Sequence, residues 1–151
     1  MMTAEQNLTA ALADVKAEIA RTDNKTALLL AFVGAMLAGS WTVAKDTRLN
    51  VAATLVGALG MALLVAAAGL LLSSVRPNLG GPHRVGFPLW ATLNAEQITA
   101  ELATDRRAQH IADLSRIAVA KFTRLKQAVD MTCMAGALLI IAALVSVGGA
   151  A

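Results

Sequence analysis

The side chains that could do chemistry in this chain form two charged groups, each placed shortly before a long apolar run. Arginine and lysine can clamp a small anion between helices through charge-assisted hydrogen bonds. Basic residues beside a membrane more commonly contact lipid phosphates, and residue types alone favour that role. Asp23 lies close to the first apolar run, where an acidic side chain needs a basic partner. Arg116 is the candidate partner. The candidate ligand-binding or coupling residues are Arg21, Asp23 and Lys25 in the first group and Ser115, Arg116 and Lys121 in the second.

Sites for enzymatic chemistry are poorly supported. The two histidines, His83 and His110, lack the Cys, His or carboxylate spacing of a metal site. Nothing matches a phosphate-binding loop or a dinucleotide turn, and no serine lies in a nucleophile elbow. The single Cys133 cannot form a disulfide framework, and no basic cluster with interleaved aromatics indicates nucleic-acid binding. We therefore expect no enzyme, no metal and no cofactor.

Three stretches without Asp, Glu, Lys or Arg position the charged groups, at residues 26–44, 49–75 and 131–151. Each is close to the ~20 apolar residues that cross a hydrocarbon core of ~30 Å. The chain is 57% hydrophobic and 15% charged, whereas roughly 25% of a soluble domain is charged. Three such runs argue against buried helices of a soluble protein. The sequence predicts an all-α membrane protein, one domain over residues 1–151, with transmembrane helices at 26–44, 50–74 and 131–150.

Two amphipathic segments flank these spans. Residues 4–25 carry an apolar stripe at spacings of three and four, begin with a Thr3–Gln6 capping box and contain neither Gly nor Pro. In the segment 76–130, a loop rich in Gly and Pro precedes a helix that starts near Asn94. We expect that helix to run unbroken from about Ala95 to Asp130 and into the third span. The two amphipathic helices are predicted to pair antiparallel as a stalk, continuous with the first and third spans.

The distribution of basic residues predicts the orientation in the membrane. Lysines and arginines precede the first span and are numerous between the second and third, whereas the connection after the first span has Lys45 and Arg48. The more basic side stays cytoplasmic, which places the N-terminus and the segment 76–130 inside. No span contains an ionisable residue of the kind that proton and ion transporters use. Small residues recur at helical spacing in the spans, as at Ala31, Ala35 and Gly39, and permit close packing of copies.

Two segments resemble a known family, the transmembrane effectors of Pycsar anti-phage systems. Residues 17–27 contain the Arg-x-Asp-x-Lys signature that leads into the first span of that family. Residues 114–122 are similar to its Leu-Ser-x-Ile-Ala-x-x-Lys-Tyr segment, with Phe122 in place of the usual tyrosine. Together the two segments span the whole layout of the chain.

The resemblance implies a function that the residues do not show by themselves. Such effectors are paired with a pyrimidine cyclase that makes cyclic CMP or cyclic UMP during phage infection. The nucleotide activates the effector, which impairs the bacterial inner membrane and stops the cell before phage matures. The expected partners are therefore the lipid bilayer, the nucleotide and further copies of the chain. Alternatives are a holin-like pore and a structural membrane subunit, neither gated by nucleotide.

Overall fold

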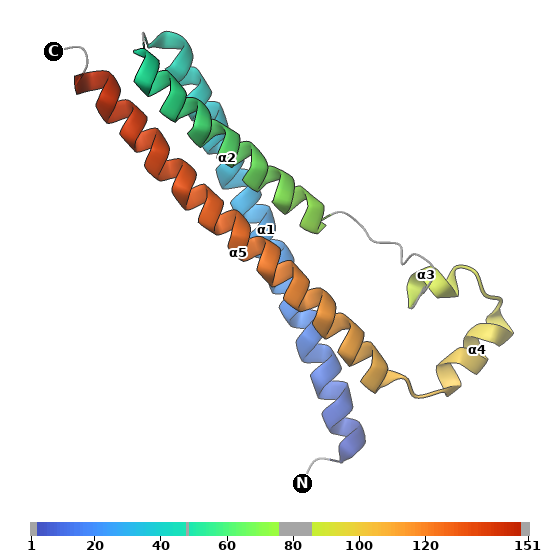
Figure 1. The fold of residues 1–151 in the computed structure, drawn as a ribbon. Coiled ribbons are helices and arrows are strands. Elements are labelled where there is room, and N and C mark those ends of the chain that lie inside the picture. The colour runs from blue at the N-terminus through green and yellow to red at the C-terminus, as the bar shows by residue number, and fades with distance from the viewer. Residues whose placement is uncertain (1–2, 48, 76–85, 149–151) are drawn as a thin grey trace. The chain divides into compact units, whose positions relative to one another are not determined.

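The protein is built of helices throughout the part that the structure describes. In this computed structural model that part comprises residues 3–47, 49–75 and 86–148, and it contains no strand. The expected loop at 76–85, including His83, lies outside it. The all-α prediction is confirmed. The helices are α1 (Ala4–Asp46), α2 (Val51–Val75), α3 (Phe87–Trp90), α4 (Ala95–Ala103) and α5 (Arg107–Gly148) (Figure 1).

Three of these helices, α1, α2 and α5, are long and apolar enough to cross a membrane. Their most apolar windows have mean hydropathies of 1.9, 2.5 and 2.2. In α2 apolar residues surround the whole helix, which is typical of a segment immersed in lipid. The prediction of three transmembrane helices is confirmed in the length and apolar composition of these helices. Both α1 and α5 continue past the apolar window as one unbroken helix.

The chain forms two compact units. The first unit comprises Met1–Glu18 and Arg76–Ala118, and the second unit comprises Ile19–Val75 and Val119–Ala151. Both α1 and α5 therefore contribute residues to each unit. The apolar windows lie in the second unit.

In the second unit, α2 packs antiparallel against α5 through small residues. A Cβ atom on Gly57 would lie 3.7 Å from Ala142 Cβ, and one on Gly60 would lie 3.1 Å from Leu139 Cγ. Such close approach is how helices pack in lipid, where burial of apolar surface gives no driving force. The buried core of this unit consists of Val33, Leu64, Leu71, Ala128 and Ala135.

The predicted antiparallel direction of the two amphipathic helices is wrong, because α1 and α5 run parallel. In the second unit, Asp23 contacts Lys121, and Met36 lies 3.8 Å from the Cβ position of Gly136. In the first unit, Arg107 at the start of α5 contacts Glu5 in the first turn of α1. The reason is topological, since α2 returns the chain and the first and third long helices must then point the same way.

The expected unbroken helix from Ala95 to Asp130 is also wrong. Thr104 ends α4 with φ −91° and ψ 121°, and the Asp105 carboxylate accepts the backbone N–H of Arg107 at 3.0 Å. This Asx turn gives the backbone an alternative to helical hydrogen bonds, so that α5 begins anew. The expected start of α4 is confirmed by a full capping box between Asn94 and Gln97.

The capping box at the start of α1 is confirmed as well. The Thr3 backbone N–H donates to Gln6 Oε1 at 2.9 Å, and the Gln6 N–H donates to Thr3 Oγ1 at 3.3 Å. These two bonds satisfy backbone donors that a helix start otherwise leaves without partners.

Replacing Gly60 by valine tests the α2–α5 contact. The new side chain would meet the Ala135 carbonyl oxygen at 3.2 Å and Leu139 at 3.1 Å. Overpacking of this kind costs ~1–3 kcal/mol, so we expect Gly60→Val to lower the thermal unfolding midpoint of the detergent-purified protein. Gly69→Val is the matched control, because nothing lies within 4 Å of a Cβ at Gly69. Equal midpoints for the two variants would contradict this packing.

Candidate functional site

An ion pair joins two of the predicted site residues in the second unit. Lys121 Nζ on α5 lies 2.5 Å from Asp23 Oδ1 on α1. The Lys121 side chain is 20% exposed and the Asp23 side chain 44% exposed. The acidic residue of the Arg-x-Asp-x-Lys signature thus finds its cation on the other long helix, at Lys121 rather than at Arg116. This pair directly links the two signature segments of the sequence.

The remaining predicted residues are distributed over the two units. Arg21 and Lys25 are exposed on α1 in the second unit, on either side of Asp23 in the sequence. Ser115 is half-buried and Arg116 is exposed, and both belong to the first unit. The Arg116 guanidinium bonds to Asp113 at 3.0 Å, one turn earlier on the same helix. An anion clamp shared by Arg21 and Arg116 stays a prediction.

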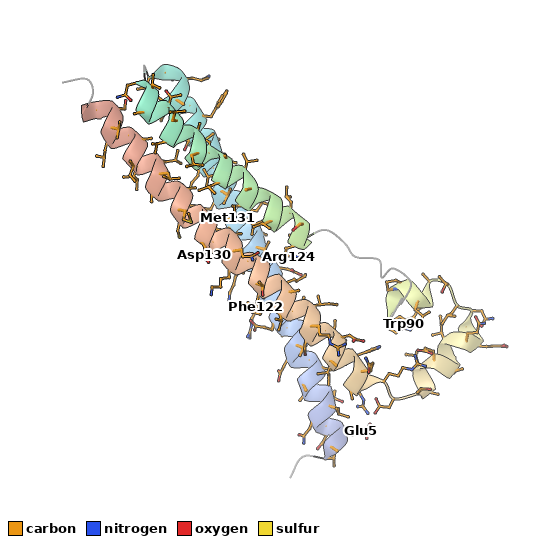
Figure 2. All side chains as sticks on the ribbon, in the orientation of Figure 1. Glu5, Trp90, Phe122, Arg124, Asp130 and Met131 are labelled. Carbon is orange, nitrogen blue, oxygen red and sulfur yellow. The ribbon has the colours of Figure 1, made fainter. Side chains whose placement is uncertain are left out.

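A second contact, which sequence reasoning missed, fastens α5 to the end of α2. Arg124 Nη1 donates to the Ser73 carbonyl oxygen at 3.4 Å, and Arg124 is labelled on α5 in Figure 2. The last carbonyls of a helix have no partner within it and attract a cation. Arg124 lies three residues after Lys121, so one turn of α5 bonds to both neighbouring helices. That spacing of two basic residues was the available signal in the sequence.

The interior of the second unit at this level contains buried hydroxyl groups beside its apolar side chains. Thr22 and Thr26 are fully buried, and the Thr26 hydroxyl donates to the Thr22 carbonyl at 2.8 Å. The Thr132 hydroxyl donates to the Ala128 carbonyl at 2.7 Å. The buried Ser74 Oγ has no hydrogen-bond partner among residues 3–47, 49–75 and 86–148, and an unsatisfied buried hydroxyl costs ~1–3 kcal/mol. The unpaired Ser74 hydroxyl therefore makes this packing less stable than one in which that hydroxyl is paired.

In the first unit, Arg107 is the centre of a hydrogen-bond cluster that the sequence did not indicate. Its guanidinium bonds to both carboxylate oxygens of Asp105 at 2.9 and 2.8 Å, to Glu5 Oε1 at 3.2 Å and to Thr9 Oγ1 at 2.8 Å. Hydrogen bonds from the Arg107 side chain and backbone lower the pKa of Asp105 to about 2. The same partners raise the pKa of Arg107 above its ordinary value, so both groups stay charged. The cluster ties the start of α5 to the start of α1.

Beside this cluster the first unit contains a cavity of about 440 Å³. Its walls come from α3, α4 and the first turn of α5, with Trp90 on α3 labelled in Figure 2. Among the described residues, no group of three His, Cys, Asp or Glu side chains could hold a metal ion. The lining of the cavity includes aromatic, basic and carboxylate side chains.

A double-mutant cycle tests the Asp23–Lys121 pair. We expect Asp23→Asn and Lys121→Gln each to lower the free energy of unfolding, with a coupling of ~0.5–1 kcal/mol because the pair is only partly shielded. The control is Arg116→Gln, whose guanidinium is 76% exposed and whose loss should cost less than ~0.5 kcal/mol. Strictly additive effects of the two changes would show that the pair contributes nothing.

Comparison with known proteins identifies the family of the chain. No match was found among curated proteins, and none among solved structures. A family model described as the Pycsar effector protein domain matches residues 7–148. The matched region includes α2, α3, α4 and α5 whole and nearly all of α1. Since the match takes in almost the whole chain, including both signature segments and all three apolar helices, this protein is a membrane protein that belongs to the Pycsar effector family.

Proposed function

We propose that the protein is a membrane effector that cyclic CMP or cyclic UMP activates, and that activation impairs the bacterial inner membrane. Membership of the Pycsar effector family, which gives the chain a role in anti-phage defence, carries this proposal. In the proposed sequence of events, a partner cyclase makes the nucleotide on infection. The cell then stops growing before phage matures. No step of this function requires catalysis by the chain itself.

The continuity of α1 and α5 supports a mechanical route for activation. Each helix carries an amphipathic segment and an apolar window without a break, over 43 and 42 residues. With the N-terminus in the cytoplasm, as the basic residues favour, a change at the start of either helix would pass along it into the bilayer. The Asp23–Lys121 and Arg124–Ser73 contacts then hold the resting arrangement. A ligand can shift that arrangement only by binding the active one more tightly.

Assembly of several copies is the second part of the proposal. One chain has three apolar helices whose spans contain no Asp, Glu, Lys or Arg, so a single copy offers little to disturb a bilayer. On α1, Ala31, Ala35 and Gly39 are exposed, and nothing lies within 4 Å of a Cβ at Gly39. Such a face of small residues allows a second helix to approach closely in lipid. We propose that it packs against another copy in a homo-oligomer.

The membrane potential of cells expressing the protein tests the activation. We expect depolarisation when an active cytidylate or uridylate cyclase is co-expressed, and none with a catalytically inactive cyclase. Depolarisation without any active cyclase would instead favour a holin-like pore. A stable potential in every case would contradict membrane impairment and favour a structural subunit.

A bulky residue on the small face tests assembly. We expect Gly39→Leu to reduce the cross-linked oligomer in membranes and the cyclase-dependent depolarisation together, because leucine holds the helices apart. Gly69→Leu on α2 serves as the control, since its Cβ position also has nothing within 4 Å in the protomer. If both variants cross-link like the parent protein, α1 is not the contact between copies.

A further inference from the structure

The cavity in the first unit has the size of a small-molecule site. At about 440 Å³ it lies within the ~300–1,000 Å³ that is usual for such sites. Residues of α3, α4 and the start of α5 line it. None of these lining residues belongs to the two signature segments, 17–27 and 114–122.

One wall of the cavity suits a flat ring. Trp90 is 37% exposed, so part of the indole is accessible, and Leu89 and Leu102 add apolar surface. Gly86 fixes the start of this wall, since its φ of 67° is a conformation that side chains with a Cβ rarely adopt. The Gly86 carbonyl accepts the backbone N–H groups of Leu89 and Trp90 at 3.0 Å. Nucleobases stack on such aromatic surfaces regardless of their identity.

The lining residues from the end of α4 to the start of α5 are charged, and their charges are paired with one another. Arg106 bonds to Glu101 at 2.8 Å, and Arg107 bonds to Asp105 and to Glu5. The guanidinium fork matches phosphate oxygens as well as it matches carboxylates. Because Arg106 is 53% exposed and Glu5 78% exposed, these ion pairs are weak and can be exchanged. His110 also lines the cavity, and its side chain makes no hydrogen bond within the described residues.

We propose that this cavity binds the activating cyclic mononucleotide, with its ring on Trp90 and its phosphate on Arg106 and Arg107, and that the phosphate competes with Glu5 for Arg107. This assignment rests on the nucleotide activation proposed above and gives it a location. The two signature segments then serve coupling rather than binding. The ligand is a mononucleotide with one phosphate and one base. It binds at the arginines that carboxylates hold in its absence.

Competition at Arg107 turns binding into a movement of α1. Glu5 and Thr9 lie in the first two turns of α1, and Arg107 is their contact on α5. A phosphate that takes the guanidinium releases the start of α1 from the start of α5. The carboxylate of Glu5 therefore opposes the ligand, and its removal should favour binding.

Tryptophan fluorescence measures this binding directly, because the chain has two tryptophans. In the full-length protein in detergent, Trp41→Phe leaves Trp90 as the reporter, and Trp90→Phe leaves Trp41 on α1. We expect cyclic CMP or cyclic UMP to quench the fluorescence of the first variant in a saturable way and that of the second not at all. Trp41 is 62% exposed on the apolar part of α1 and controls for non-specific quenching.

Calorimetric titration of charge variants gives effects of opposite sign. Arg106→Gln should weaken nucleotide binding about tenfold, as the loss of one charge-assisted hydrogen bond does. Glu5→Gln should tighten binding about two- to fivefold, since it removes an exposed competing ion pair. Lys16→Gln, an exposed charge elsewhere on α1, should change nothing. Tighter binding by Glu5→Gln cannot result from misfolding, and retained helicity is checked by circular dichroism.

The outcomes separate this inference from the proposed function. If the unaltered protein binds neither cyclic CMP nor cyclic UMP, nucleotide activation by direct binding is wrong and the cavity assignment falls with it. If it binds one of them but Trp90 is not quenched and Arg106→Gln binds normally, the function stands and the cavity is not the site. Quenching together with the opposite effects of Arg106→Gln and Glu5→Gln supports both.

Discussion

The structure depends on one constraint, that backbone N–H and C=O groups inside hydrocarbon must find their partners within the same segment. An unpaired group there costs several kcal/mol, so an apolar run must cross as an unbroken helix. In α1 and α5 this helical order continues beyond the apolar windows, so that each is one helix of more than 40 residues. In our proposal, whatever holds or releases the start of such a helix acts through it on the membrane portion.

The same constraint explains the direction of the helices, which amphipathic pattern alone does not contain. An apolar stripe shows which face of a helix is covered, but an antiparallel and a parallel partner cover it equally well. Three successive crossings of the bilayer make α1 and α5 parallel, because the first and third crossings must run in the same direction. The contact of Lys121 with Asp23 follows from this, since the basic and acidic residues lie at corresponding heights on parallel helices.

The helices could be predicted from local and periodic signals in the sequence, whereas the tertiary contacts could not. The apolar windows, the capping box at Thr3 and the capping side chain of Asn94 rest on neighbouring residues. The structure has both caps where the sequence places them, and three helices that each contain an apolar window. The break at Asp105 was missed because it depends on one carboxylate that competes for a backbone N–H, without the glycine or proline that marks most breaks. The role of Arg107 was missed because Glu5 is about a hundred residues away. Sequence motifs indicated Asp23 and Lys121 as important, but pairing them required the fold.

The two kinds of contact in the molecule suit different tasks. Small residues packed at the α2–α5 interface, as at Gly60, have no alternative arrangement of equal density and keep the helices together. The ion pairs of Lys121 and Arg107 are partly exposed and worth only ~0–1 kcal/mol each, so phosphate or water can replace a partner at little cost. A switch needs two arrangements that differ by a few kcal/mol at most, because a ligand supplies no more than its differential affinity. Contacts of the second kind meet that requirement, and in our proposal they are the ones on which the nucleotide acts.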